Sequence, residues 1–166
     1  MSYYTDLPQS FVDSIPHRDL LSGAALTRWT RERDSQRSRV YTAELSVRNN
    51  EEQMTHSELV SFSNKILASD IWREHGGPRS LVIDTSTRRY AMCTANLSTN
   101  TIHLAASWGL NKLIIVHELT HFLIPEPHAH HGALFCRLFL LFTDRFIAHN
   151  TMLRLRLAFR LGGVQF

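Results

Sequence analysis

A few polar residues inside an apolar segment constrain the possible folds of this 166-residue chain more than any other feature does. Residues 113–123 are almost continuously apolar, yet they contain the sequence His117-Glu118-Leu119-Thr120-His121. Such a segment predicts a buried helix, which the sequence Pro125-Glu126-Pro127 ends. Because residues four apart lie on one face of a helix, the two imidazoles can hold one metal ion. Burying two histidines and a glutamate without such a partner would be costly.

This HExxH pattern predicts a zinc site with Glu118 beside it as the catalytic base. Zinc lowers the pKa of water to about 7, and Glu118 would accept the proton. A catalytic zinc ion usually has three protein ligands, so a third must come from elsewhere in the chain. The candidates downstream of the motif are Glu126, His128, His130, His131 and Asp144. Among them His131 stands directly before Gly132 and a further predicted helix, which favours it and leaves the others open.

Two resemblances to known families extend this interpretation. The spacing from His121 to His131-Gly132-x-x-Phe135 resembles that of the SprT-like zinc metallopeptidases, in which the histidine before the glycine is the third ligand. The resemblance therefore implies that His131 is the third ligand. The segments 33–44 and 157–164 are similar to the opening and the close of a family of small metallohydrolases from actinobacteria and their phages. That match spans residues 33–164 and implies no particular substrate.

Three charged residues of the 33–44 segment need their own interpretation. We interpret Arg33, Arg37 and Glu44 as a structural ion-pair network behind the site, with contact to a partner as the alternative. The resemblance gives these residues no known role.

Hydrophobic periodicity and the motif together predict an α+β, zincin-like domain at 33–166 after a partly irregular N-terminal tail at 1–32. Helices are expected at 18–31, 33–47, 56–74, 113–123, 132–147 and 150–161, with a small, mainly antiparallel sheet of strands at 80–84, 90–95 and 101–105. The alternation at 153–161 also fits a strand, and a helix is preferred. His103 is expected to be half-exposed. If its strand formed the sheet edge above the metal, a peptide could pair with it.

Composition limits the expected partners. The net charge is only +3, which gives nucleic-acid binding weak support, and the arginines at 145, 154, 156 and 160 are expected on a solvated helix face. Cys93 and Cys136 are expected as buried thiols. They are too few for the zinc ribbon that SprT-like proteins acting on DNA-bound proteins usually carry. With no signal-peptide pattern and no apolar run of about 20 residues, a cytoplasmic protein without a membrane segment is expected.

Two functions from different classes follow from these observations. The first is a zinc metallopeptidase that cleaves peptide or amide bonds of a protein or peptide substrate, with Glu118 as the base. The second is a non-catalytic, metal-stabilised binding protein, such as a phage protein directed at a host factor, which would tolerate the loss of Glu118. The intact Glu118 favours the hydrolase. The sequence leaves the substrate, the native metal and the oligomeric state open.

Overall fold

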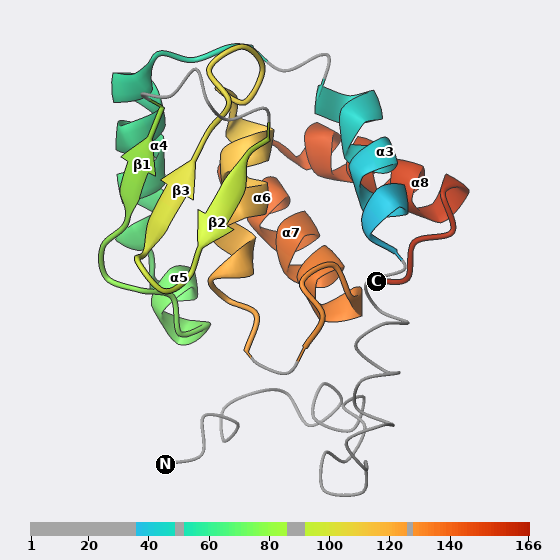
Figure 1. Ribbon diagram of the computed structural model, residues 1–166. Coiled ribbons are helices and arrows are strands. Elements are labelled where there is room, and N and C mark those ends of the chain that lie inside the picture. Colours follow the sequence, from blue (N-terminus) through green and yellow to red (C-terminus); the bar gives the residue numbers. More distant parts are fainter. Residues whose placement is uncertain (1–35, 49–51, 86–91, 126–127) are drawn as a thin grey trace, which may run out of the picture.

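A computed structural model describes residues 36–48, 52–85, 92–125 and 128–166 of the chain. Within these ranges the fold is α+β, as predicted, with six helices and a three-stranded mixed sheet (Figure 1). In chain order the elements are α3 (Arg37–Arg48), α4 (His56–Leu67), α5 (Asp70–Glu74), β1 (Val82–Asp84), β2 (Thr94–Asn96), β3 (Thr101–His103), α6 (Lys112–His121), α7 (Ala133–Phe146) and α8 (His149–Leu161). The predicted tail and the predicted helix at 18–31 lie outside the described residues.

The sheet differs from the prediction of a mainly antiparallel one. Its strand order is β1-β3-β2, with β2 antiparallel and β1 parallel to β3. The tight turn after β2 explains the antiparallel pair, because the Asn96 side chain accepts hydrogen bonds from the backbone of Ser98 and Thr99. β1 pairs with the other side of β3 and runs in the same direction. The third strand is therefore central, so the condition that it forms the edge is not met, and among the described strands β2 lies at one edge of the sheet.

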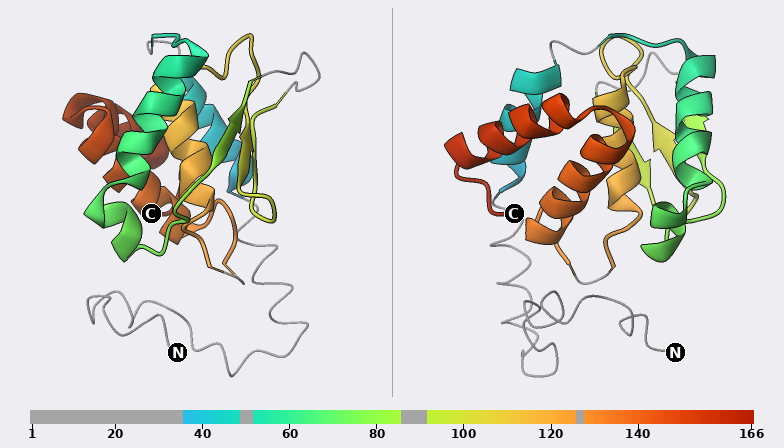
Figure 2. Two further views of the ribbon diagram at one scale, coloured as in Figure 1. Left: turned by 90° about the vertical axis from the view of Figure 1, so that its left-hand side faces the viewer. Right: turned by 180° about the vertical axis from the view of Figure 1, so that it is seen from behind.

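The helices build the core around α6. Figures 1 and 2 show the sheet in front of α4 and α6, with α3, α7 and α8 on the opposite side of α6 from α4. In α6 every residue from Leu113 to His121 is buried, which explains why this segment is apolar almost all round. In α8 the buried residues Thr151, Leu155 and Phe159 recur every four positions, which confirms a helix over the alternative strand.

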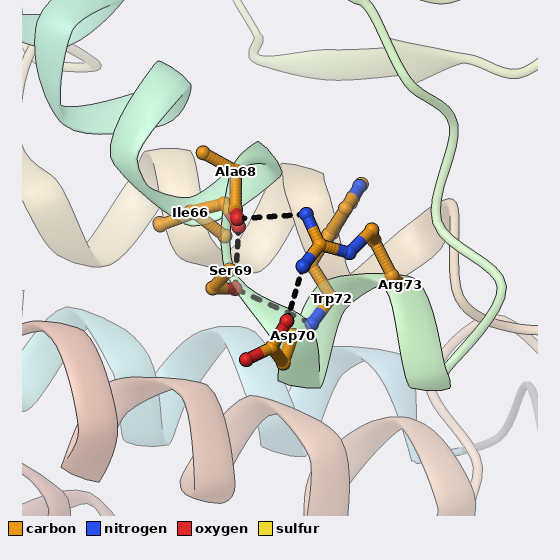
Figure 3. Close-up of polar contacts among 6 residues, drawn as sticks. All are labelled: Ile66, Ala68, Ser69, Asp70, Trp72 and Arg73. Atoms are coloured by element: carbon orange, nitrogen blue, oxygen red, sulfur yellow. Dashed lines mark hydrogen bonds and ion pairs between the residues drawn. The ribbon is translucent and has the colours of Figure 1, made fainter.

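The predicted single helix at 56–74 is wrong, because the chain breaks between α4 and α5 (Figure 3). Ser69 has extended backbone angles, and its hydroxyl accepts a hydrogen bond from the backbone N–H of Trp72. The same hydroxyl donates to the carbonyl of Ile66 at 2.6 Å. Arg73 pairs with Asp70 and donates to the carbonyl of Ala68. Ser69 thus ends one helix and caps the next.

Other sequence predictions in this region are confirmed. The helical segment ends at the sequence Gly76-Gly77-Pro78, as predicted, and Gly76 has the positive φ of 77° that favours glycine. A Cβ atom at Gly77 would lie 2.1 Å from the Trp72 side chain, so only glycine fits there.

Cys93 and Cys136 are buried and free. None of the helices in the described ranges has the length and apolar character that crossing a membrane requires.

Candidate metal centre

The helix α6 carries the first two predicted ligands and Glu118. Asn111 caps this helix by accepting a hydrogen bond from the backbone N–H of Ile114 at 3.0 Å. One turn separates His117 from His121, the last residue of α6, and their ring centroids lie 5.0 Å apart. The spacing therefore places both imidazoles on one face of the helix, as the motif predicts.

His131 joins them from the start of α7. Its ring centroid lies 5.5 Å from that of His117 and 5.0 Å from that of His121. The three side chains offer ligand atoms that all lie within 4.8 Å of one another. The buried amide of Gln36 donates to the carbonyl of His131 at 3.1 Å and fixes the loop. Phe135 packs against all three imidazoles, with centroid distances of 4.9, 4.7 and 5.1 Å.

The other described candidates for the third ligand are not part of this group of ligand atoms. Asp144 is exposed and pairs with His149 at 2.6 Å. His130 is exposed, and its ring centroid lies 5.4 Å from that of His121. His128 is partly buried and lies outside the group of three ligand atoms. Glu126 lies outside the described residues. On the described residues, the structure brings together the same three histidines that the motif and the resemblance select.

The three rings fit a metal ion on chemical grounds. They are 1%, 7% and 5% exposed in chain order, so they are almost fully removed from solvent. Each carries a buried nitrogen without a hydrogen-bond partner among the described residues, namely Nε2 of His117, Nδ1 of His121 and Nε2 of His131. An unsatisfied buried polar group costs about 1–3 kcal/mol. A cation bound by imidazole nitrogens would remove this cost, since neutral imidazole is a common ligand of zinc.

Glu44 supports the site in a way the sequence interpretation missed. Its Oε2 atom lies 2.8 Å from Nδ1 of His117, in ion-pair contact although without the angles of a regular hydrogen bond. Both side chains are buried, with 3% and 1% exposure. Glu44 therefore makes an ion pair behind the site, as expected, and its partner is the ligand His117. Arg33 lies outside the described residues. A carboxylate behind a metal-binding histidine fixes the ring and leaves Nε2 for the metal.

The charges around the cluster set the protonation of the rings. Burial lowers the pKa of His131 to about 3 and that of His121 well below its usual value, so both are neutral and able to bind a metal. Burial also disfavours the charged form of His117, but Glu44 outweighs it and raises the pKa of that ring. The carboxylate thus makes His117 the most basic of the three ligands.

Glu118 is placed beside the cluster with an altered acidity. It is 4% exposed, and burial raises its pKa to about 7, although His117 acts in the opposite direction. The backbone of Ala95 in β2 acts in the same direction as His117 and favours the charged carboxylate. A carboxyl group with a pKa near neutrality can both accept and return a proton.

No family model, curated protein or solved structure matches this chain. The assignment of the site therefore depends on its geometry and on the residues themselves.

The sequence contained a signal for Glu44 that the interpretation did not use. The apolar residues Val40, Ala43 and Val47 define the buried face of α3, and Glu44 falls on that same face. A charged residue on an apolar helix face predicts a buried partner. Gln36, one turn before Val40, is buried for the same reason. No local pattern could have identified the partner of either residue, because both contacts are between distant segments.

Proposed function

We propose that this protein is a zinc-dependent hydrolase of the zincin type, a metallopeptidase that cleaves peptide or other amide bonds. The observation that carries the proposal is the group of three histidine ligand atoms within 4.8 Å, with the buried Glu118 next in sequence to the first of them. His117, His121 and His131 would hold the ion, and the protein would leave one position open to solvent or substrate. A zinc ion bound there would activate water and polarise the scissile carbonyl.

Glu118 is the general base of the proposed reaction. Its burial beside the ligands suits a carboxylate that takes a proton from the attacking water and later gives it to the leaving amine. Glu44 would not share this role, since its carboxylate faces Nδ1 of His117. The two carboxylates therefore have different tasks, set by their contacts.

The edge strand β2 is the proposed place for a peptide substrate. This strand packs against α6, the helix that carries Glu118, so it borders the site. On its other side β2 pairs with β3. An extended peptide adding to this edge by backbone hydrogen bonds would bring its carbonyl groups close to Glu118.

The test is a cleavage assay on the zinc-loaded protein, with a library of unstructured peptides read by mass spectrometry. We expect cleavage by the wild type, and a loss of at least about 10²-fold in Glu118→Gln, the scale of general-base catalysis. Zinc content should be unchanged in this variant, because Glu118 is not a ligand. Glu74→Gln, an exposed glutamate at the end of α5, is the matched control and should cleave like the wild type. Equal turnover in Glu118→Gln and the wild type would contradict the proposal.

One observation favours a second candidate, a metal-stabilised binding protein without catalysis. All three ligands and Glu118 are less than a tenth exposed, as in a structural metal site. Such a protein would bind one zinc ion and cleave no peptide. It would also keep its partner affinity in Glu118→Gln, which separates it from the hydrolase.

A further inference from the structure

Two polar side chains of α3 lie between the histidine cluster and solvent. The ring of Tyr41 is stacked on His117, with a centroid distance of 5.4 Å and an interplanar angle of 15°, and lies 5.1 Å from His131. Tyr41 is 36% exposed, whereas each of the three histidines is at most 7% exposed. Its ring therefore packs against two of the ligands, while the residue as a whole stays partly exposed to solvent.

Arg37 is bound to this tyrosine. It precedes Tyr41 by one helical turn, and its guanidinium carbon lies 5.5 Å from the centroid of the Tyr41 ring. The guanidinium also acts on the Tyr41 phenol as a nearby positive charge. The phenol O–H group can donate to an acceptor, and the guanidinium of Arg37 lies close to the same ring.

The charges near the cluster are divided by sign. The guanidinium of Arg37 is exposed and acts as a positive charge on both His121 and His131. The carboxylates of Glu44 and Glu118, by contrast, are buried. The solvent-facing rim therefore offers positive charge and a hydroxyl donor, which suits a negatively charged oxygen.

We propose that Tyr41 and Arg37 form an oxyanion-binding pair on the solvent side of the three histidines. The inference rests on the proposed hydrolase function. Water attacks the scissile carbonyl carbon, its proton passes to Glu118, and the carbonyl electron pair moves to the oxygen, which becomes negative. The Tyr41 hydroxyl, polarised by Arg37, donates to this oxygen. The C–N bond then breaks, and the amine takes the proton from Glu118. Fixed donors aimed at a developing negative charge are a major source of rate enhancement in hydrolases.

Inorganic phosphate, a tetrahedral oxyanion, is the probe for this pair. The zinc-loaded full-length protein is titrated with phosphate by calorimetry, as wild type, Tyr41→Phe and Arg37→Gln. Phenylalanine retains the stacking on His117 and removes only the hydroxyl, so a purely structural role predicts no change. We expect each variant to bind phosphate about 10-fold more weakly, the effect of one charge-assisted hydrogen bond. The double variant should lose less than the product of the two single losses, because both groups bind one oxygen.

Controls separate this inference from the proposed function. Zinc affinity should be the same in all variants, and Arg145→Gln, an exposed arginine at the end of α7, should bind phosphate like the wild type. Glu118→Gln should also retain phosphate binding, since it removes the base and leaves the pair intact. Equal phosphate affinity in wild type, Tyr41→Phe and Arg37→Gln, or no phosphate binding by the zinc-loaded wild type, would overturn the pair. A failure of peptide cleavage would instead count against the hydrolase.

Discussion

At the scale of single residues, Glu44 shows how one buried carboxylate affects the histidine cluster. Its Oε2 atom lies 2.8 Å from Nδ1 of His117, and both groups are shielded from solvent. The carboxylate orients the ring and makes its other nitrogen a stronger donor to a cation. The Oε1 atom of Glu44 has no hydrogen-bond partner within the described part of the chain, so the contact with His117 is the main electrostatic role we assign to this side chain.

We therefore expect Glu44→Gln to lower zinc affinity about 10- to 100-fold, as other losses of a carboxylate behind a histidine ligand do. Glutamine keeps the shape of the side chain, so the change removes charge and little packing. Competition with a chromophoric chelator measures the affinity. Glu74→Gln, at an exposed position, is the control and should bind zinc like the wild type. An unchanged affinity in Glu44→Gln would show that this carboxylate does not act through the metal.

The same residues show what the sequence could predict at this scale. His117, Glu118 and His121 were predicted because the geometry of one helix fixes their relative positions. His131 was only one of several candidates until the motif comparison selected it, since its approach depends on how α7 packs on α6. Glu44 was expected in a structural ion pair, but its partner could not be predicted, because His117 lies in another helix and no spacing encodes the contact.

At the scale of elements, the break between α4 and α5 sets the position of α5, in which Trp72 is the buried residue. The apolar stripe runs through both helices, so periodicity alone predicted one helix. Ser69 interrupts this stripe, because its hydroxyl donates to the carbonyl of Ile66 and accepts from the backbone N–H of Trp72. The sheet shows a similar limit: the local hairpin was predicted correctly, whereas the parallel pairing of β1 with β3 depends on a non-local contact.

Ser69→Ala should destabilise the protein by about 0.5–2 kcal/mol, the usual cost of losing a helix cap. Urea unfolding followed by circular dichroism measures the change. Ser61→Ala, at an exposed position within α4, should stay within about 0.5 kcal/mol of the wild type. If the two variants were equally stable, Ser69 would not hold the junction between the helices.

At the scale of the whole molecule, the site joins segments that are distant in the chain. The amide oxygen of Gln36 accepts from the backbone N–H of Gln165 at 2.7 Å, while its amide nitrogen donates to the carbonyl of His131. The start of α3, the loop before α7 and the C-terminal segment therefore meet beside the ligands. Composition and periodicity predicted the α+β class, but this convergence is tertiary and could not be read from local patterns. The zincin-like architecture remains a proposal.

The most direct test is X-ray absorption at the zinc edge on the purified, zinc-loaded protein. The account predicts one zinc ion per chain with three imidazole nitrogens at about 2.0–2.1 Å, completed by a light oxygen donor. In His131→Ala one imidazole should disappear from the spectrum. Failure to bind zinc, a sulfur ligand from a cysteine, or an unchanged spectrum in His131→Ala would contradict the claim that these three histidines form a metal centre.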